Sequence, residues 1–252
     1  MAADPAAEAG GAALLIACAL GIERFALRGA DLGAAAVTVL RTGMGPQSAE
    51  RAVTRALTGR SGGSGGSGGP GGPGEPGGRS TAVIATGFCA GLAPGMHPGD
   101  LVVADETRDP AGRTVCTGTR ILADALSHPL PGGPRRAVHI GPVVGSDHVV
   151  RGTERAALHS TGAIAVDMES AATLRTAVGH GVRPVAAVRV VVDAPEHELV
   201  RIGTLRGGIS AFRVLRTVLP AFFHWHRYSL LPGGELDGHA SPPDHPGRDV
   251  SL

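Results

Sequence analysis

The sequence predicts a single α/β domain in which strands and helices alternate along the chain. The chain has 252 residues, of which 42% are hydrophobic, and this is enough to bury one large core. Short apolar runs typical of buried strands alternate with segments of helical periodicity. The clearest example spans residues 162–193, where an apolar run (163–166), an alanine-rich helical segment ending at Gly179 and a second apolar run (185–192) follow one another.

This strand–helix–strand unit is expected to bring two carboxylates to one edge of the sheet. We expect its two strands to be parallel and adjacent or nearly so, joined by a right-handed crossover. Glu169 and Asp193 follow these strands directly, at the edge where open α/β sheets bind ligands. Structural alternatives stay open, since acidic residues favour the first turn of a helix and Asp is common in turns. Arg189 lies inside the second apolar run, where a charge needs a partner.

The remaining elements are predicted from apolar runs and helical stripes. Residues 19–25 are expected to form a loop, residues 87–92 a glycine-rich turn, and Thr153 the N-cap of a short helix. A C-terminal helix is expected to break near Pro220. We expect strands at 13–18, 34–40, 81–86, within 94–107 and at 137–144, and helices at 47–58, 117–127, 153–159 and 210–219.

Composition excludes several classes of protein. The net charge of +1 leaves no electrostatic footprint for nucleic acid. Cys18, Cys89 and Cys116 form neither a disulfide framework nor a metal motif, which favours a reducing cytoplasm. The apolar run 12–22 follows acidic rather than basic residues, so it is not expected to be a signal peptide. No run reaches the ~20 apolar residues that span a bilayer. The histidines are scattered, and no metal site is expected.

Three segments are expected to be disordered because of their composition. They are the N-terminus (1–11), the Gly/Ser/Pro-rich segment 61–78 and the tail (232–252). The middle segment is interpreted as a surface loop inside one domain (12–231), because too few residues precede it for an independent core. Loop-closure entropy grows only logarithmically with length, so such an insertion is tolerated.

Two motifs at the predicted sheet edge resemble a known family. The strings AVDMESAA (165–172) and VRVVVD (188–193) resemble the VEMEAAA and VRxISD motifs of the purine/uridine phosphorylase superfamily, which includes the methylthioadenosine nucleosidases. The resemblance extends from residue 13 to about 220. It implies a three-layer α/β/α fold with a mixed central sheet. It also implies cleavage of the N-glycosidic bond of a purine nucleoside without metal or organic cofactor, phosphate being a candidate co-substrate.

The family's functional residues carry over onto these motifs. The resemblance implies that Glu169 binds the ribose 2′- and 3′-hydroxyls, that Met168 packs against the sugar, and that Asp193 is the general acid protonating the purine at N7. Val192 stands where the family commonly has a serine that orients this acid. Glu23 falls at the position of the glutamate that activates water in the nucleosidases. The alternative for Glu23 is a solvated loop charge.

Weaker motifs add further candidates on the sugar side. TGMG (42–45) resembles the family's SGIGK turn and places Met44 near the ribose 5′ side. GFCAGL (87–92) resembles the GSAGGL loop and places Gly87 and Phe88 beside the sugar and the nucleophile. Purine phosphorylases tend to carry an arginine and a serine for phosphate where this chain has Ala85 and Phe88. This difference favours water as the nucleophile.

On the base side, GSDHVVRG (145–152) resembles the SGDxFI segment. Val149 and Val150 then take the place of the residues whose backbone pairs with the purine edge. Arg189 completes the expected substrate-binding set.

The subgroup that the strings resemble most is the hopanoid-associated phosphorylases, which implies an adenine nucleoside with a large apolar 5′ substituent such as adenosylhopane. Aromatic residues gather near the C-terminus beside arginines, as in a segment at a membrane surface, although a core helix or dimer contact explains them equally well. We therefore expect a cytoplasmic homo-oligomer that touches a membrane peripherally. The alternatives are a methylthioadenosine/S-adenosylhomocysteine-type nucleosidase, a general purine nucleoside phosphorylase, or a non-catalytic nucleoside-binding protein. The aromatic residues are Phe212, Phe222, Phe223, Trp225 and Tyr228.

Overall fold

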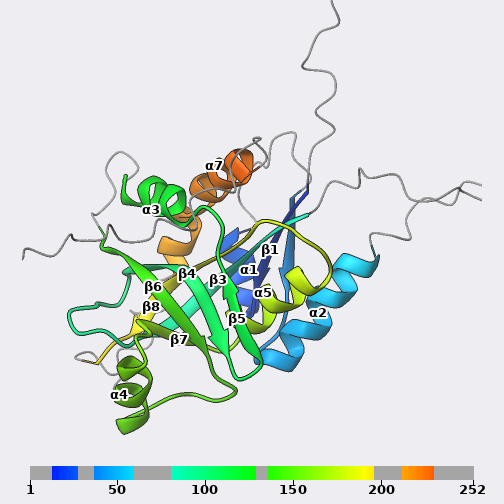
Figure 1. The fold of residues 1–252 in the computed structure, drawn as a ribbon. Coiled ribbons are helices and arrows are strands. Elements are labelled where there is room, and N and C mark those ends of the chain that lie inside the picture. Colours follow the sequence, from blue (N-terminus) through cyan, green and yellow to red (C-terminus); the bar gives the residue numbers. More distant parts are fainter. Residues whose placement is uncertain (1–12, 28–36, 60–80, 129–135, 196–211, 230–252) are drawn as a thin grey trace, which may run out of the picture.

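A computed structural model describes residues 13–27, 37–59, 81–128, 136–195 and 212–229 (Figure 1). The three segments expected to be disordered (1–11, 61–78 and 232–252) lie outside these residues, so those predictions stay predictions.

Within the described residues, eight strands form one mixed sheet (Figure 1). The order is β2-β1-β3-β7-β6-β4-β5, and β8 pairs with both β3 and β4. The successive pairs β3–β7, β7–β6, β6–β4, β4–β8 and β8–β3 close a ring, so this part of the sheet curls onto itself. The strands are β1 (Leu14–Cys18), β2 (Val37–Arg41), β3 (Ala82–Gly91), β4 (Leu101–Asp109), β5 (Gly112–Val115), β6 (Val138–Gly145), β7 (Ala165–Asp167) and β8 (Val185–Asp193).

Alternate residues of the central strands face two helical layers, as the period of two in a strand requires. In β1, Leu14 and Ile16 join the cluster that includes Leu122 and Trp225, whereas Leu15 joins the opposite cluster with Leu174. The three-layer α/β/α arrangement is thereby confirmed, with α3 and α7 on one face of the sheet and α2 and α5 on the other (Figure 1). The helices are α1 (Gly21–Ala26), α2 (Pro46–Thr58), α3 (Thr119–Ser127), α4 (Thr153–Ser160), α5 (Ser170–Gly179) and α7 (Leu219–Ser229).

The prediction that the strands around α5 are parallel is wrong. β7 runs antiparallel to β3, while β8 runs parallel to β3. The two strands therefore run in opposite directions along the two edges of β3, and Ala90 pairs with Val166 on one edge and with Asp193 on the other. Glu169 and Asp193 still follow the ends of their strands and both line one pocket, but β3 lies between these strands, so no crossover between parallel neighbours brings the two residues there.

Several local predictions also differ from the structure. Residues 21–26 form the short helix α1 rather than a loop, and β3 continues as strand through the expected glycine-rich turn to Gly91. Strand β5, which pairs with β4 in a hairpin, was not predicted. Gly152 precedes α4, and Thr153 is its first residue rather than its N-cap.

The aromatic C-terminal segment packs into the core. Phe222 and Trp225 are fully buried, and the Trp225 indole Nε1 donates a hydrogen bond of 2.7 Å to the Thr117 carbonyl. These two rings therefore cannot face a membrane, and the alternative of a core helix holds for them. The helical conformation of residues 212–217 is interrupted by a bend at Val218, and α7 begins at the next residue, with Pro220 as its second residue. In the ranges that the structure describes, no helix has the length and apolar character to cross a bilayer.

Candidate active site

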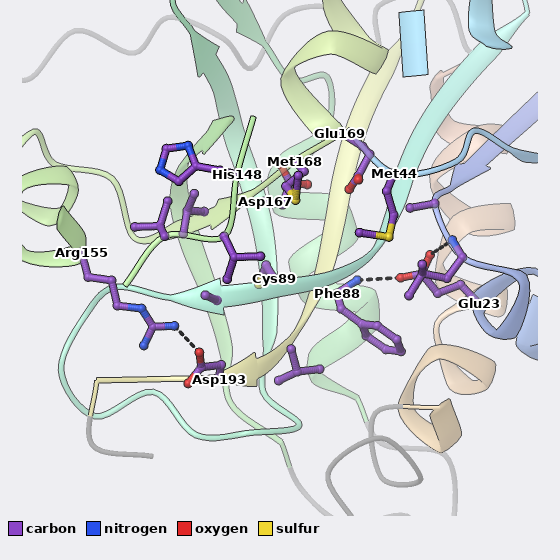
Figure 2. A pocket seen from close by; sticks show the side chains of 17 residues that line it. Glu23, Met44, Phe88, Cys89, His148, Arg155, Asp167, Met168, Glu169 and Asp193 are labelled. Atoms are coloured by element: carbon purple, nitrogen blue, oxygen red, sulfur yellow. Dashed lines mark hydrogen bonds and ion pairs between the residues drawn. The ribbon is translucent and has the colours of Figure 1, made fainter. Parts of the chain in front are cut away.

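A pocket of about 280 Å³ opens where β7 and β8 meet the end of β3 (Figure 2). Its walls come from α1, from the turn after β2, from β3, from the segment after β6, from α4, from the β7–α5 junction and from the end of β8. In Figure 2, Arg155 and Asp193 lie on one side, and Glu23, Met44 and Glu169 lie on the other. The lining residues are Ala19, Leu20, Glu23, Met44, Phe88, Cys89, Ala90, His148, Val149, Val150, Arg155, Val166, Asp167, Met168, Glu169, Val192 and Asp193.

Most of the predicted site residues line this single pocket, although they come from six separate stretches of the sequence. Two predicted residues, Gly87 and Arg189, do not line it. The predicted residues on its walls are Glu23, Met44, Phe88, Val149, Val150, Met168, Glu169 and Asp193.

Glu23 is a buried carboxylate held by the main chain. It is only 2% exposed, so the alternative of a solvated loop charge is excluded. Its Oε2 accepts a hydrogen bond of 2.7 Å from the Leu20 amide, and its Oε1 accepts one of 3.1 Å from the Phe88 amide. Burial raises the pKa of Glu23, while these amides and the charge of Arg189 act in the opposite direction. A raised pKa brings a carboxylate closer to the range of a general base.

Gly87 and Arg189 lie behind Glu23 and support it. A Cβ atom on Gly87 would lie 2.6 Å from the Glu23 carboxylate and 2.8 Å from the Arg189 guanidinium, so only glycine lets the two charged groups approach here. Arg189 is 1% exposed and forms an ion pair of 2.6 Å with Asp167, the partner that its burial requires. It also donates to the Ser170 hydroxyl at 2.7 Å and to the Thr86 carbonyl at 3.0 Å. Arg189 therefore lies outside the pocket lining and holds the lining residue Asp167 in place.

Charge explains why three carboxylates tolerate this proximity. Burial lowers the pKa of Arg189, but the charges of Asp167, Glu169 and Glu23 outweigh that effect and raise it. The guanidinium thus remains positive at the centre of the acidic group. One cation among three acids leaves a negative local balance when all are ionised.

Glu169 lies at the N-cap of α5 and faces the turn after β2. Its Oε1 accepts a hydrogen bond of 2.9 Å from the Gly45 amide, which ties the β7–α5 junction to the turn that carries Met44. The side chain is buried, and this burial raises its pKa against the opposing charge of Arg189. A carboxylate fixed beside the pocket can accept hydrogen bonds from sugar hydroxyls.

Asp193 occupies the opposite wall and is bound by an arginine. Its Oδ2 forms an ion pair with Nη2 of Arg155, which reaches across from α4 (Figure 2). The Arg155 side chain is 7% exposed and that of Asp193 22%. Asp193 is thus held by another side chain, whereas Glu23 is held by backbone amides.

The space between the two acidic ends is largely apolar, and it is bounded by Phe88, Val150, Met168 and Val192. Such a surface suits the faces of a planar base and a sugar. Cys89 also lines it, but burial raises the pKa of this thiol far above its usual value, so it stays protonated and is a poor nucleophile.

Sequence reasoning missed three polar residues of the pocket. Asp167 belongs to the AVDMESAA string itself, and its role as partner of Arg189 was open to inference there. His148 lines the pocket and contacts Glu154 at 3.0 Å, within the GSDHVVRG segment and the start of α4. Arg155 carried no signal, because a single arginine in a short polar helix is usually exposed.

Comparison with known proteins gives one family. Residues 22–219, most of the chain, match the family described as the phosphorylase superfamily. No curated protein matches the sequence.

Solved structures share the fold at low sequence identity. An S-adenosylhomocysteine nucleosidase from Streptococcus pyogenes, solved with 5-methylthiotubericidin, has a TM-score of 0.64 and 18% identity over 85% of this chain and 97% of its own. A 5′-methylthioadenosine/S-adenosylhomocysteine nucleosidase from Neisseria meningitidis, bound to methylthio-immucillin-A, has a TM-score of 0.64 and 18% identity over 84% and 98%. The enzyme of this kind from Streptococcus pneumoniae, bound to 8-aminoadenine, has a TM-score of 0.61 and 19% identity over 84% and 99%.

Proposed function

The chain belongs to the phosphorylase superfamily, and on that basis we propose that its pocket cleaves the N-glycosidic bond of a purine nucleoside and releases the free base. One observation carries the proposal. Besides Asp167, which is paired with Arg189, a single apolar pocket holds the buried carboxylates of Glu23 and Glu169 on one side and the carboxylate of Asp193 on the other. This arrangement offers a base, a sugar-binding group and an acid around one bond.

On the sugar side, the bond breaks through an oxocarbenium-like state with positive charge on the ribose. The ionised Glu23 takes a proton from the attacking water, whose oxygen bonds to the anomeric carbon. Glu169 accepts hydrogen bonds from the ribose hydroxyls and fixes the ring. The acidic group around Arg189 has a negative local balance, which stabilises the developing positive charge.

On the base side, the electrons of the broken bond move onto the purine. Asp193, when protonated, donates its proton to N7 and so prevents the base from leaving as an anion. Val149 and Val150, from the GSDHVVRG segment, line the pocket, which supports their contact with the edge of the base.

We favour water over phosphate as the nucleophile. A phosphate beside the sugar needs cationic or hydroxyl donors. Among the described lining residues, the arginine is Arg155, and it is paired with Asp193 on the base side. Phe88 presents a ring on the sugar side, and Ala85 is buried in the core.

The 5′ side of the substrate is proposed to be apolar. Met44, predicted near this side, is 62% exposed and lines the pocket, so an apolar substituent finds a thioether rather than a charge. The nucleosidases that share the fold are named for 5′-thio adenine nucleosides, which supports adenine as the base. The proposed substrate with the largest 5′ substituent is a nucleoside of the adenosylhopane type, as used in hopanoid biosynthesis.

A homo-oligomer is proposed as the working form. On α1, next to the pocket, Ile22 and Phe25 are 51% and 66% exposed. The Phe25 ring stacks on Phe212 with centroids 6.0 Å apart, which makes this apolar surface continuous with the C-terminal segment. Covering it with a second copy would remove apolar area from water. Size-exclusion chromatography with light scattering tests this, and a monomer at micromolar concentration would contradict it.

The function is tested by measuring base release from a nucleoside panel with and without phosphate. The panel contains adenosine, 5′-methylthioadenosine, adenosines with long 5′-alkyl groups, inosine and uridine. We expect adenine release that is independent of phosphate and faster for apolar 5′ groups. A ribose 1-phosphate product would replace hydrolysis by phosphorolysis. Nucleoside binding without base release from any substrate would support the non-catalytic alternative.

A further inference from the structure

Arg155 is a buried charge that the reaction outlined above does not use. It belongs to α4, which contributes no other residue to the pocket lining. The residue is 6% exposed, and its Nη2 bonds to Asp193, 38 positions further along the chain. A guanidinium is rarely buried without a strong reason, because removing it from water costs several kcal/mol.

The remaining contacts of Arg155 do not suggest a stabilising role. Its Nε and Nη1 atoms are buried without a hydrogen-bond partner among the described residues. A buried guanidinium with one satisfied nitrogen is a net cost to folding, and such groups in native proteins usually have a functional explanation. Arg189 differs in this respect, since its contacts with Asp167, Ser170 and Thr86 are the kind that stabilise a buried guanidinium.

The position of the ion pair indicates what Arg155 does. Asp193 ends β8, and the side chain of its neighbour Val192 has no polar atom that could orient the carboxyl group. The carboxyl must nevertheless present one oxygen to the leaving base with a defined direction. Nη2 of Arg155 fixes Oδ2 of Asp193, and a guanidinium does this more rigidly than a hydroxyl because its donors are planar.

We propose that Arg155 is the positioning residue of the leaving-group acid. It aligns Asp193 with the base and stabilises the carboxylate that remains after proton transfer. The inference rests on the proposed function. The balance of the step is complete: the Asp193 proton goes to the base, the C–N bonding electrons follow it, and water supplies hydroxide to the sugar and a proton to Glu23. The negative charge left on Asp193 then faces a fixed positive partner.

A substrate that needs no acid separates positioning from structure. 4-Nitrophenyl β-D-riboside releases a stable phenolate, so its cleavage depends on Glu23 but little on Asp193. We expect Arg155→Met to lower kcat for the best purine nucleoside ~10–100-fold with KM changed much less. The expected loss on the nitrophenyl riboside is below ~3-fold. Arg155→Lys should recover part of the purine activity, because a point charge restores the attraction without the planar geometry.

The controls are an exposed arginine and a double variant. Arg151→Met removes an exposed charge four positions earlier and should leave both substrates unaffected. Asp193→Asn combined with Arg155→Met should be no slower than Asp193→Asn alone, since Arg155 acts through Asp193. The thermal midpoint of Arg155→Met serves as the folding control and should stay close to that of the wild type, because the Asp193 side chain that loses this partner is 22% exposed and remains within reach of water.

The outcomes distinguish a failure of the positioning role of Arg155 from a failure of the proposed function. Wild-type purine activity in Arg155→Met, equal losses on both substrates, or additive losses in the double variant would overturn the positioning role and leave the proposed function standing. If Arg155→Met does not fold, Arg155→Lys decides, and equal losses on both substrates would again overturn the role. A wild-type protein that cleaves neither substrate overturns the proposed function and this inference together.

Discussion

The two ends of the pocket hold their carboxylates by different means. At the end proposed to bind the sugar (the sugar end), Glu23 accepts hydrogen bonds from the amides of Leu20 and Phe88, and Glu169 accepts one from Gly45. At the end proposed to bind the base (the base end), the side chain of Arg155 bonds to Asp193. Backbone amides stay where the fold puts them, whereas a side-chain partner depends on a single residue.

The difference implies that the two ends respond differently to substitution. The sugar end is fixed by α1, β3 and the turn after β2, so it tolerates changes in neighbouring side chains as long as the backbone keeps its path. The base end includes a side-chain ion pair, which a single substitution removes. The predictions that follow test this contrast, from the largest expected effect to the smallest.

Replacing Glu23 by Gln should give the largest loss. The amide keeps the shape but cannot take a proton from water, and general-base catalysis contributes ~10²–10⁴-fold. Because every substrate needs the nucleophile, purine nucleosides and 4-nitrophenyl riboside should lose activity alike in steady-state assays. A Glu23→Gln enzyme that retains wild-type kcat on either substrate would remove Glu23 from the mechanism.

Replacing Asp193 by Asn should cost ~10²-fold or more on purine nucleosides, because the acid is lost and its shape is kept. In contrast to Glu23→Gln, the nitrophenyl riboside should be cleaved at nearly the wild-type rate. The ratio of the two substrates' kcat values is the informative measurement. Parallel losses on both substrates would mean that Asp193 supports the whole site rather than the leaving group.

Replacing Gly87 by Ala should disturb the sugar end from behind. The new Cβ would collide with the carboxylate of Glu23, and the φ angle of +135° is unfavourable for alanine. We expect ~10-fold lower kcat and a loss of ~1–3 kcal/mol in the free energy of unfolding, measured by denaturant titration. Gly59→Ala is the matched control, because its Cβ would meet nothing within 4 Å and its φ is −64°. Equal behaviour of the two variants would show that Glu23 and Arg189 shift freely.

The dependence of kcat/KM on pH should reflect the buried base. Burial raises the pKa of Glu23 above its ordinary value of 4.5, and Glu23 acts only when it is ionised. The activity should therefore be present at neutral pH and fall as the pH decreases through a midpoint above 4.5. The stability contribution has the opposite sign. A carboxyl with a raised pKa stabilises the fold below pH 4.5 and loses that contribution as the pH rises through its folded value. Activity that persists below pH 4.5 would contradict the assignment of Glu23 as the base.

Shortening the segment 61–78 should have the smallest effect. It lies outside the described residues, and its Gly/Ser/Pro-rich composition predicts a surface loop. We expect the thermal midpoint and kcat to remain close to the wild-type values, since loop-closure entropy changes slowly with length. A drop of many degrees in a calorimetric scan would show that the segment packs against the domain.

The sequence by itself determined the α/β class, most strand positions and eight of the residues that line the pocket. Local patterns suffice for these: apolar runs mark the strands, and the strings AVDMESAA and VRVVVD carry Met168, Glu169 and Asp193 at fixed distances from strand ends. The sequence also predicted a partner for Arg189, because a charge inside an apolar run cannot remain unpaired.

Only the tertiary structure decided how these pieces meet. The opposite directions of β7 and β8 follow from their pairing with the two edges of β3, and strand direction leaves no mark in local periodicity. The role of Gly87 depends on Glu23, which is 64 positions away, and the Arg155–Asp193 pair joins a short polar helix to a buried strand. The C-terminal aromatic residues also show what sequence cannot decide. An aromatic segment of this composition fits either a protein core or a membrane surface. Only the tertiary structure, in which Trp225 bonds to Thr117 and packs in the α3 layer, assigns it to the core.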